Sequence, residues 1–198
     1  MALPFTQPVS TSEECLSLER ASERRECWAG LVSAITGESL SHRVPCFNLA
    51  GTVHAQLTGT RCRGFSPHMK VRSSDRVLFA CPDLAMVCGE LRFHDEHGDV
   101  LVNPTAIFEI LSPSTGAYAR SEKFQRYTTI DKDYVLIAQD RPHGERFSRR
   151  ADGAWERAEL DVVSEVPSLR SIVEFRWPHC TTGSVSQTNE RRAWQRKL

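Results

Sequence analysis

Residues 106–114 read AIFEILSPS, and within the first six of these Glu109 is the single residue that is not apolar. A short run rich in isoleucine and phenylalanine that stops at Ser-Pro-Ser is typical of a strand buried on both faces of a sheet. A carboxylate in such a strand costs about 2–5 kcal/mol unless a salt bridge, a raised pKa or a metal ion compensates it. Glu109 is therefore the first residue whose surroundings need a physical explanation.

The composition is that of one globular domain of ordinary size. The chain has 198 residues, of which 40% are hydrophobic and 25% are charged, which is enough to build a single core. Because its 25 basic and 25 acidic side chains cancel, bulk charge gives no argument for nucleic-acid binding, although a local basic groove is compatible with it. We expect a single domain over residues 1–180 and a polar, basic and flexible tail over residues 181–198.

The distribution of cysteines and apolar residues bears on the cellular compartment. The seven cysteines include no CxxC pair, and several lie within apolar runs. This pattern predicts reduced, buried cysteines in a cytoplasmic protein. No apolar run approaches about 18 residues, and the first residues lack the pattern of a signal peptide, so we expect no membrane span and no membrane partner.

The order of the expected elements predicts a mixed α/β domain around one central sheet. Thr11 fits the N-cap of a capping box that begins a helix reaching about residue 26, and residues 41–57 favour a second helix with Pro45 in its first turn. A third helix is expected over residues 117–130. Strands are expected over residues 28–35, 61–65, 68–72, 77–88 with a break at Pro82, 106–111 and 133–140, with a hairpin over residues 143–160.

Two carboxylates and a lysine in this pattern form a candidate site. Asp83 lies in the otherwise apolar run 77–88, and Glu109 lies near the end of its buried strand. If the two strands are neighbours, both carboxylates converge at one edge of the sheet, where two like charges in a dry site need a cation. Lys123 lies early in the following helix, and Tyr127 is four residues further on, on the same helical face.

Such a set suits metal-assisted hydrolysis of a phosphodiester. The carboxylates would hold Mg²⁺, which polarises the phosphate and lowers the pKa of a bound water, while the lysine positions the water or neutralises charge in the transition state. The spacing alone does not separate this interpretation from a structural one, in which Asp83 and Glu109 are bound by backbone donors and arginine side chains. Both interpretations stay open on the residues alone.

Four segments in order, PDLAMVC, IFEILSPST, RSEKFQRY and DYVLIAQD, resemble the Uma-two family of nucleases in the PD-(D/E)XK restriction-endonuclease-like superfamily. The resemblance runs from about residue 11 to residue 175. It implies a restriction-endonuclease-like α/β (α+β) fold, a central mixed sheet flanked by helices, with a C-terminal hairpin. It also implies a metal-dependent endonuclease that uses Mg²⁺ or Mn²⁺ and acts on nucleic acid, on DNA rather than RNA, with a homodimer as one option.

The resemblance also implies the roles of individual residues. Asp83 and Glu109 match the two acids of the motif and would be catalytic metal ligands, and the backbone carbonyl of Ile110 would be a further ligand. The superfamily usually has a lysine at the position of Leu111, but this family resembles a variant that takes it from the following helix, where Lys123 lies. Further candidate site residues are Glu26, His42, Lys70 and Tyr127.

His42 and Lys70 each have a structural interpretation as well as a functional one. His42 would contact phosphate or line the site, or it would simply open the second helix. Lys70 would face the cleft, although a strand lysine more often faces solvent.

Departures from the family pattern leave a second function open. Ala29 and Leu31 stand where the family usually has acids, and Ala138 stands where an aspartate is often found. If those acids contribute to the site, metal binding is weakened. The alternative is a catalytically decayed restriction-endonuclease-like fold that serves as a module for binding nucleic acid or protein.

Overall fold

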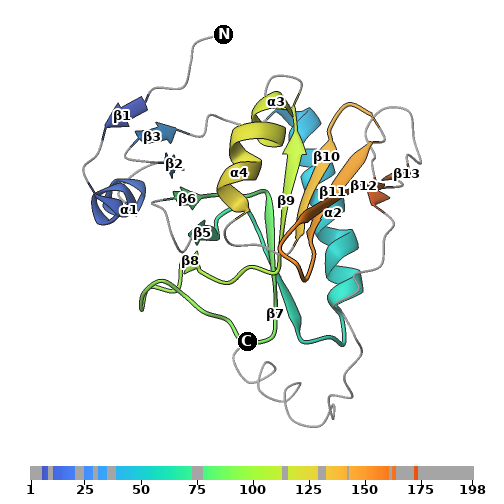
Figure 1. The fold of residues 1–198 in the computed structure, drawn as a ribbon, viewed down its shortest axis with the longest axis horizontal. Coiled ribbons are helices and arrows are strands. Elements are labelled where there is room, and N and C mark those ends of the chain that lie inside the picture. Colours follow the sequence, from blue (N-terminus) through green and yellow to red (C-terminus); the bar gives the residue numbers. More distant parts are fainter. Residues whose placement is uncertain are drawn as a thin grey trace.

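Two six-stranded sheets organise the chain in the computed structural model (Figure 1). The structure describes residues 6–8, 11–20, 25–28, 31–34, 39–72, 78–112, 116–128, 133–141, 143–160, 162–163 and 172–173. The expected tail over residues 181–198 therefore lies outside the described residues. Within the described ranges, no helix is both long and apolar enough to cross a membrane.

The larger part of the core surrounds the second of these sheets, the main sheet. Its strand order is β12-β11-β10-β9-β7-β4. The central strands β9 (Ala106–Leu111) and β10 (Asp133–Ala138) are buried along their whole length and run parallel. The other neighbours are antiparallel. They are β4 (Cys62–Phe65), β7 (Leu84–Cys88), β11 (Gly144–Arg149) and β12 (Trp155–Leu160).

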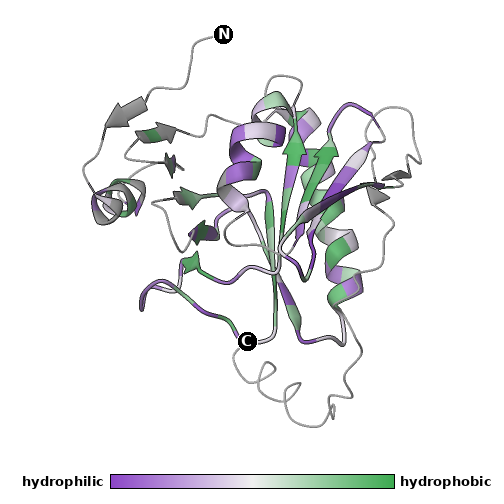
Figure 2. Ribbon diagram, in the orientation of Figure 1, coloured by the Kyte–Doolittle hydropathy of each residue, from purple (hydrophilic) through white to green (hydrophobic). Residues whose placement is uncertain are grey.

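Helical segments cover both faces of the main sheet. The helix α2 (Leu40–Leu57) packs its buried side chains against Phe108 and Ile110 of β9. The crossover from β9 to β10 covers the other face and packs against Ile107 and Leu111. This crossover consists of α3 (Gly116–Tyr118), a π-helical segment η1 (Ala119–Lys123) and α4 (Phe124–Tyr127). Figure 2 shows the apolar strands between these more polar helices.

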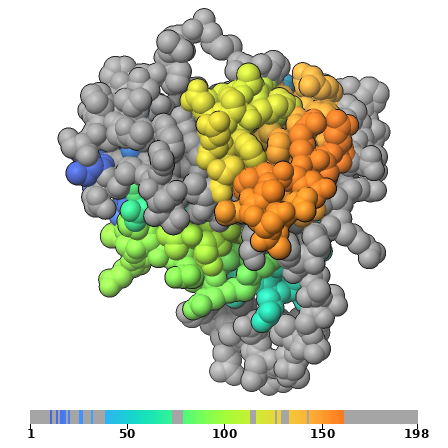
Figure 3. All heavy atoms as spheres, in the orientation of Figure 1, coloured from blue at the N-terminus to red at the C-terminus, as the bar shows by residue number. Residues whose placement is uncertain are grey.

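An aromatic cluster fixes the crossover against the hairpin β11–β12. The ring of Phe124 lies 4.6 Å from that of Phe147 and 5.3 Å from that of Trp155, centroid to centroid, and it stacks on Tyr134 at 5.8 Å. Aromatic pairs at such distances contribute about 0.5–1.5 kcal/mol each beyond their buried area. Figure 3 shows the crossover in yellow beside the hairpin in orange on one face of the molecule.

The other six-stranded sheet has the order β1-β3-β2-β6-β5-β8 and a small core of its own. Its strands are β1 (Thr6–Pro8), β2 (Arg25–Trp28), β3 (Leu31–Ala34), β5 (Lys70–Arg72), β6 (Leu78–Ala80) and β8 (Val100–Leu101). The helix α1 (Ser12–Arg20) contributes Leu16 to this core. A separate two-stranded pair joins β13 (Val162–Val163) to β14 (Ile172–Val173).

The expected central mixed sheet flanked by helices is confirmed, but a second six-stranded sheet accompanies it, and Pro82 marks where the chain passes between the two. The run 77–88 that was expected as one interrupted strand divides into β6 and β7, which belong to different sheets. Proline has no N–H to donate to a ladder, so pairing stops there and the chain can pass from one sheet to the other.

The first helix is shorter than the sequence predicts. The backbone N–H of Glu14 donates to Thr11 Oγ1 at 3.1 Å, which confirms the N-cap, but α1 ends at Arg20 and residues 25–28 form β2 instead. The strand predicted over residues 28–35 is in fact the second arm of an antiparallel pair, β2 with β3. Pairing with β3 and β6 overrides the helical tendency of this segment.

Two further predictions from the sequence need correction. Cys62 and Cys88 lie opposite each other on β4 and β7 and form a disulfide, so the argument for a cytoplasmic location from reduced cysteines no longer holds. Pro45 lies in the second turn of α2 rather than the first, because the helix begins at Leu40. The second helix, the strands of the main sheet and the hairpin are confirmed.

Candidate active site

Glu109 and Lys123 meet at the face of the main sheet that the crossover covers. Glu109 alternates with its apolar neighbours along β9 and so points to this face. The ammonium nitrogen of Lys123 lies 2.8 Å from Glu109 Oε1, and the hydroxyl of Tyr127 donates to the same oxygen at 3.1 Å. The buried carboxylate therefore has two donors from one helical face, as the spacing of Lys123 and Tyr127 predicts.

The helical segment that carries Lys123 is not regular. Lys123 is the last residue of the π-helical segment η1, between α3 and α4. Single π-helical turns inside α-helices are rare and occur often at functional sites. Lys123 at the end of this segment and Tyr127 four residues further on both contact Glu109 of β9.

Asp83 lies beside Glu109 because of the pairing of β7 with β9. Leu84 is opposite Phe108 in the antiparallel register, so the next residues along the two strands are Asp83 and Glu109. Asp83 is buried, and its Oδ2 accepts a hydrogen bond from the backbone N–H of Ile110 at 2.7 Å. This confirms the neighbouring strands that the two carboxylates require.

Two more elements bring charged groups to the same place. His42, in the first turn of α2, has its Nε2 atom 3.3 Å from Asp83 Oδ2. Glu26, on β2 of the other sheet, has its Oε1 atom 3.0 Å from the nitrogen of Lys123. The cluster thus draws its members from both sheets and both helical layers.

The electrostatics of the cluster are dominated by burial. Removal from water, together with the negative charges of Asp83 and Glu26, raises the pKa of Glu109 to about 8 in spite of the opposing charge of Lys123. Burial alone would lower the pKa of Lys123, but the carboxylates of Glu109 and Glu26 outweigh it and raise that pKa well above 10.5. Lys123 is therefore an ammonium group at neutral pH.

The donor set fits a hard divalent cation. Glu109 and Glu26 contact one ammonium group, and Asp83 lies beside Glu109, whose pKa is raised by burial and by the negative charges of Asp83 and Glu26. Carboxylate and carbonyl oxygens are the ligands that Mg²⁺ and Mn²⁺ prefer. The residues present are therefore chemically suited to such an ion.

Other predicted site residues have different surroundings. Lys70 does not face solvent: it is buried on β5, and its nitrogen contacts Asp99 Oδ2 at 2.9 Å. Asp99 also pairs with Arg20, so Lys70 belongs to a second charged group in the other sheet. For Ile110, the structure places the backbone N–H against Asp83, and the role of its carbonyl as a ligand stays a prediction.

Of the residues that depart from the family pattern, the structure describes the side-chain surroundings of Ala138 only. Ala138 is opposite Leu111 in the register of β9 and β10, and it lines a hollow of about 270 Å³ beyond the ends of these strands. Arg120 and Arg141 line the same hollow. Ala29 and the side chain of Leu31 lie outside the described residues.

Two relationships were not apparent from the sequence. Glu26 reaches Lys123 from a strand rather than from the predicted helix, and no local pattern indicates this long-range contact. Cys46 lies one turn after His42 on α2, with its Sγ atom 3.8 Å from His42 Nδ1. The spacing His-x₃-Cys was a readable signal for this second contact, because residues four apart share a helical face.

The main sheet with helical layers on both faces is a restriction-endonuclease-like fold. The fold resembles the crystal structure of a putative nuclease belonging to DUF820 from Anabaena variabilis, with a TM-score of 0.62 and 18% identity over 80% of this chain and 90% of that one. The chain belongs to the Uma2 family, described as "Putative restriction endonuclease", whose sequence model matches residues 12–180.

Two proteins of Synechocystis sp. are similar in sequence along most of their length. "Uncharacterized protein sll1609" is 27% identical over 162 residues, which cover 81% of this chain and 92% of that protein. "Uncharacterized protein slr1290" is 29% identical over 156 residues, which cover 77% of this chain and 80% of that protein. The similarity therefore extends over most of this chain.

Proposed function

We propose that this chain is a nuclease that hydrolyses phosphodiester bonds of nucleic acid, DNA rather than RNA, with Mg²⁺ or Mn²⁺ as its cofactor. The observation that carries the proposal is the contact of Lys123 with both Glu109 and Glu26 beside Asp83. A purely structural ion pair needs one carboxylate for one ammonium group. Here a buried excess of carboxylates is retained, and such an excess is costly unless a cation uses it.

In this proposal Asp83 and Glu109 hold the metal ion, with the carbonyl of Ile110 as a third protein ligand. When bound, the ion supplies a polarised phosphate and a water of lowered pKa. Two hydrogen bonds orient the ligands: Tyr127 fixes one oxygen of Glu109, and the N–H of Ile110 fixes Asp83. Ligands held in this way, on β9 and just before β7, need little rearrangement.

Lys123 acts in this proposal as a fixed positive charge and hydrogen-bond donor. Its raised pKa keeps the proton on the nitrogen, so it is unsuited to act as a general base at neutral pH. It orients the attacking water or stabilises the charge that develops on the phosphate oxygens. Glu26 contacts the same nitrogen at 3.0 Å and so helps to hold Lys123 in position.

The test is cleavage of DNA and of RNA by the full chain, with Mn²⁺ added back after treatment with a chelator. We expect cleavage by the wild type, and a loss of about 10²–10³-fold in rate for Lys123→Gln and for Glu109→Gln. Two matched controls should keep the wild-type rate. Glu159→Gln makes the same change on the exposed strand β12, and Lys70→Gln removes another buried, paired lysine.

The outcomes separate the proposal from a decayed binding module. Cleavage that is lost in Lys123→Gln and Glu109→Gln but kept in both controls supports the nuclease. Binding of nucleic acid without cleavage by the wild type, or equal cleavage by all variants, overturns it. Near-ultraviolet circular dichroism of each variant shows whether a lost rate reflects a lost fold.

A further inference from the structure

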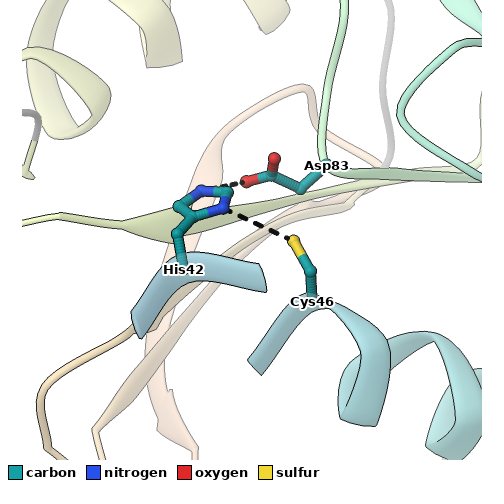
Figure 4. A group of neighbouring side chains, drawn as sticks. All are labelled: His42, Cys46 and Asp83. Atoms are coloured by element: carbon teal, nitrogen blue, oxygen red, sulfur yellow. Dashed lines mark hydrogen bonds and ion pairs between the residues drawn. The ribbon is translucent and has the colours of Figure 1, made fainter. Parts of the chain in front are cut away.

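His42, Cys46 and Asp83 bring three different ligand atoms to one place on the α2 side of Asp83 (Figure 4). His42 and Cys46 are one helical turn apart on α2, so they share a face. His42 Nε2 lies 3.3 Å from Asp83 Oδ2, and Cys46 Sγ lies 3.8 Å from His42 Nδ1. A nitrogen, a sulfur and an oxygen from these side chains all lie within 4.8 Å of one another.

The chemistry of this set differs from that of the carboxylate cluster. Thiolate and imidazole ligands select borderline or soft ions such as Zn²⁺, whereas Mg²⁺ and Mn²⁺ take oxygen ligands. A pair of ligands at positions i and i+4 of a helix is a recurring arrangement in zinc sites. We propose that His42, Cys46 and Asp83 form a second metal site, specific for Zn²⁺ and similar thiophilic divalent ions.

The distances are compatible with a single tetrahedral ion. Zn²⁺ binds sulfur at about 2.3 Å and nitrogen or oxygen at about 2.0–2.2 Å, so neighbouring ligand atoms lie about 3.3–3.8 Å apart. The imidazole of His42 now lies between the thiol and the carboxylate, as Figure 4 shows. A rotation of this ring directs one nitrogen to the ion, while the N–H of Ile110 continues to orient Asp83. Three protein ligands leave the fourth position for water.

The two metal sites would share Asp83. This consequence rests on the proposed function: an ion held by His42 and Cys46 takes the carboxylate that the hydrolytic metal needs, so Zn²⁺ inhibits a Mn²⁺-supported nuclease. The binding of Zn²⁺ itself does not depend on nuclease activity. Cys46 belongs to the thiophilic site alone, and Glu109 belongs to the carboxylate cluster alone, so the two sites can be separated by substitution.

The experiment is a titration of the full chain with Co²⁺, which replaces Zn²⁺ and gives a near-ultraviolet charge-transfer band when a thiolate binds it. Displacement of Co²⁺ by Zn²⁺ then gives the affinity for Zn²⁺, and Mn²⁺ binding is measured separately by calorimetry. Cys46→Ser should abolish the band and weaken Zn²⁺ binding at least about tenfold while Mn²⁺ binding is kept. Glu109→Gln should keep the band and weaken Mn²⁺ binding.

A second cysteine outside the disulfide, Cys81, provides the matched control. Cys81 is buried two residues before Asp83, and Cys81→Ser should keep the Co²⁺ band. Absence of a band in the wild type, a band that survives Cys46→Ser, or a band that is lost in Cys81→Ser overturns the thiophilic site. Loss of Mn²⁺ binding alone counts against the proposed nuclease and leaves the thiophilic site standing.

Discussion

Lys123 Nζ and Glu109 Oε1 are 2.8 Å apart, although one residue lies on a central strand and the other on the crossover that follows it. The parallel pairing of β9 with β10 requires such a crossover over the face of the sheet. The crossover that joins the two parallel strands therefore brings Lys123 over the face of the sheet to Glu109. Lys123 lies about two turns into the crossover, whereas Leu111 on the strand itself is apolar.

The first prediction concerns the pH dependence of stability without metal. The pKa of Glu109 is about 8 in the folded chain, above its ordinary value of 4.5. Between these values the native state binds a proton that the unfolded state has released, so the free energy of unfolding falls as pH rises. Glu109→Gln removes this titrating group and, with it, its contribution to the fall in the free energy of unfolding. We expect the variant to gain on the order of 1–3 kcal/mol relative to the wild type between about pH 5 and pH 8.

Urea unfolding of both proteins in the presence of a chelator, at several pH values, measures this difference. Glu159→Gln is the control, because this exposed side chain should leave the slope with pH unchanged. Parallel curves for the wild type and Glu109→Gln would show that the carboxyl group of Glu109 titrates alike in both states, contrary to the prediction.

Much of this site is predictable because it depends on local patterns. The alternation along β9 places Glu109 on a defined face, and the four-residue spacing places Lys123 and Tyr127 on one face of the helix. The break at Pro82 marks the start of β7 and hence the position of Asp83. Each of these inferences needs a short window of sequence only.

The rest depends on contacts between distant segments. The role of residues 25–28 as a strand is set by pairing with β3 and β6, and this pairing brings Glu26 to Lys123. The disulfide likewise depends on the register that places Cys62 opposite Cys88. No periodicity within either segment specifies its partner, so the second sheet and the disulfide were missed.

The second prediction concerns the hydroxyl of Tyr127. Tyr127→Phe removes its hydrogen bond to Glu109 Oε1 without changing the packing of the ring. We expect a loss of about 1–2 kcal/mol in stability and a drop in Mn²⁺ affinity, because the carboxylate loses one of its two donors. Chemical denaturation and calorimetry measure the two effects. Tyr134→Phe is the control, since that hydroxyl donates to the carbonyl of Ala119 instead, and it should affect stability alone.

The third prediction concerns Glu26, whose negative charge contributes to the raised pKa of Glu109. Glu26→Gln should lower that pKa, so the fall in stability with pH should end at a lower pH than in the wild type. It should also reduce the cleavage rate, because Lys123 loses one of the two carboxylates that position it. Unfolding curves and rate measurements over the same pH range test both effects. An unchanged pH range would mean that the two carboxyl groups are uncoupled.

The fourth prediction concerns the disulfide between β4 and β7. It closes a loop over a sequence separation of 26 residues, and such a cross-link stabilises a fold by about 2–4 kcal/mol, mainly by restricting the unfolded chain. We expect the double variant Cys62→Ala/Cys88→Ala to lose stability in this range when it is measured by urea unfolding without reductant. The register of β4 and β7 should keep Asp83 in place, so Mn²⁺ binding should persist.

Cys46 and Cys81, which are outside the disulfide, provide the matching comparison for this cross-link. The double variant Cys46→Ala/Cys81→Ala replaces the same number of cysteines without opening a disulfide, so it should lose much less stability. A thiol titration of the unfolded protein gives an independent count, because the Cys62→Ala/Cys88→Ala variant should show the same number of free thiols as the wild type. Two fewer thiols in the variant would mean that Cys62 and Cys88 are reduced in the wild-type protein.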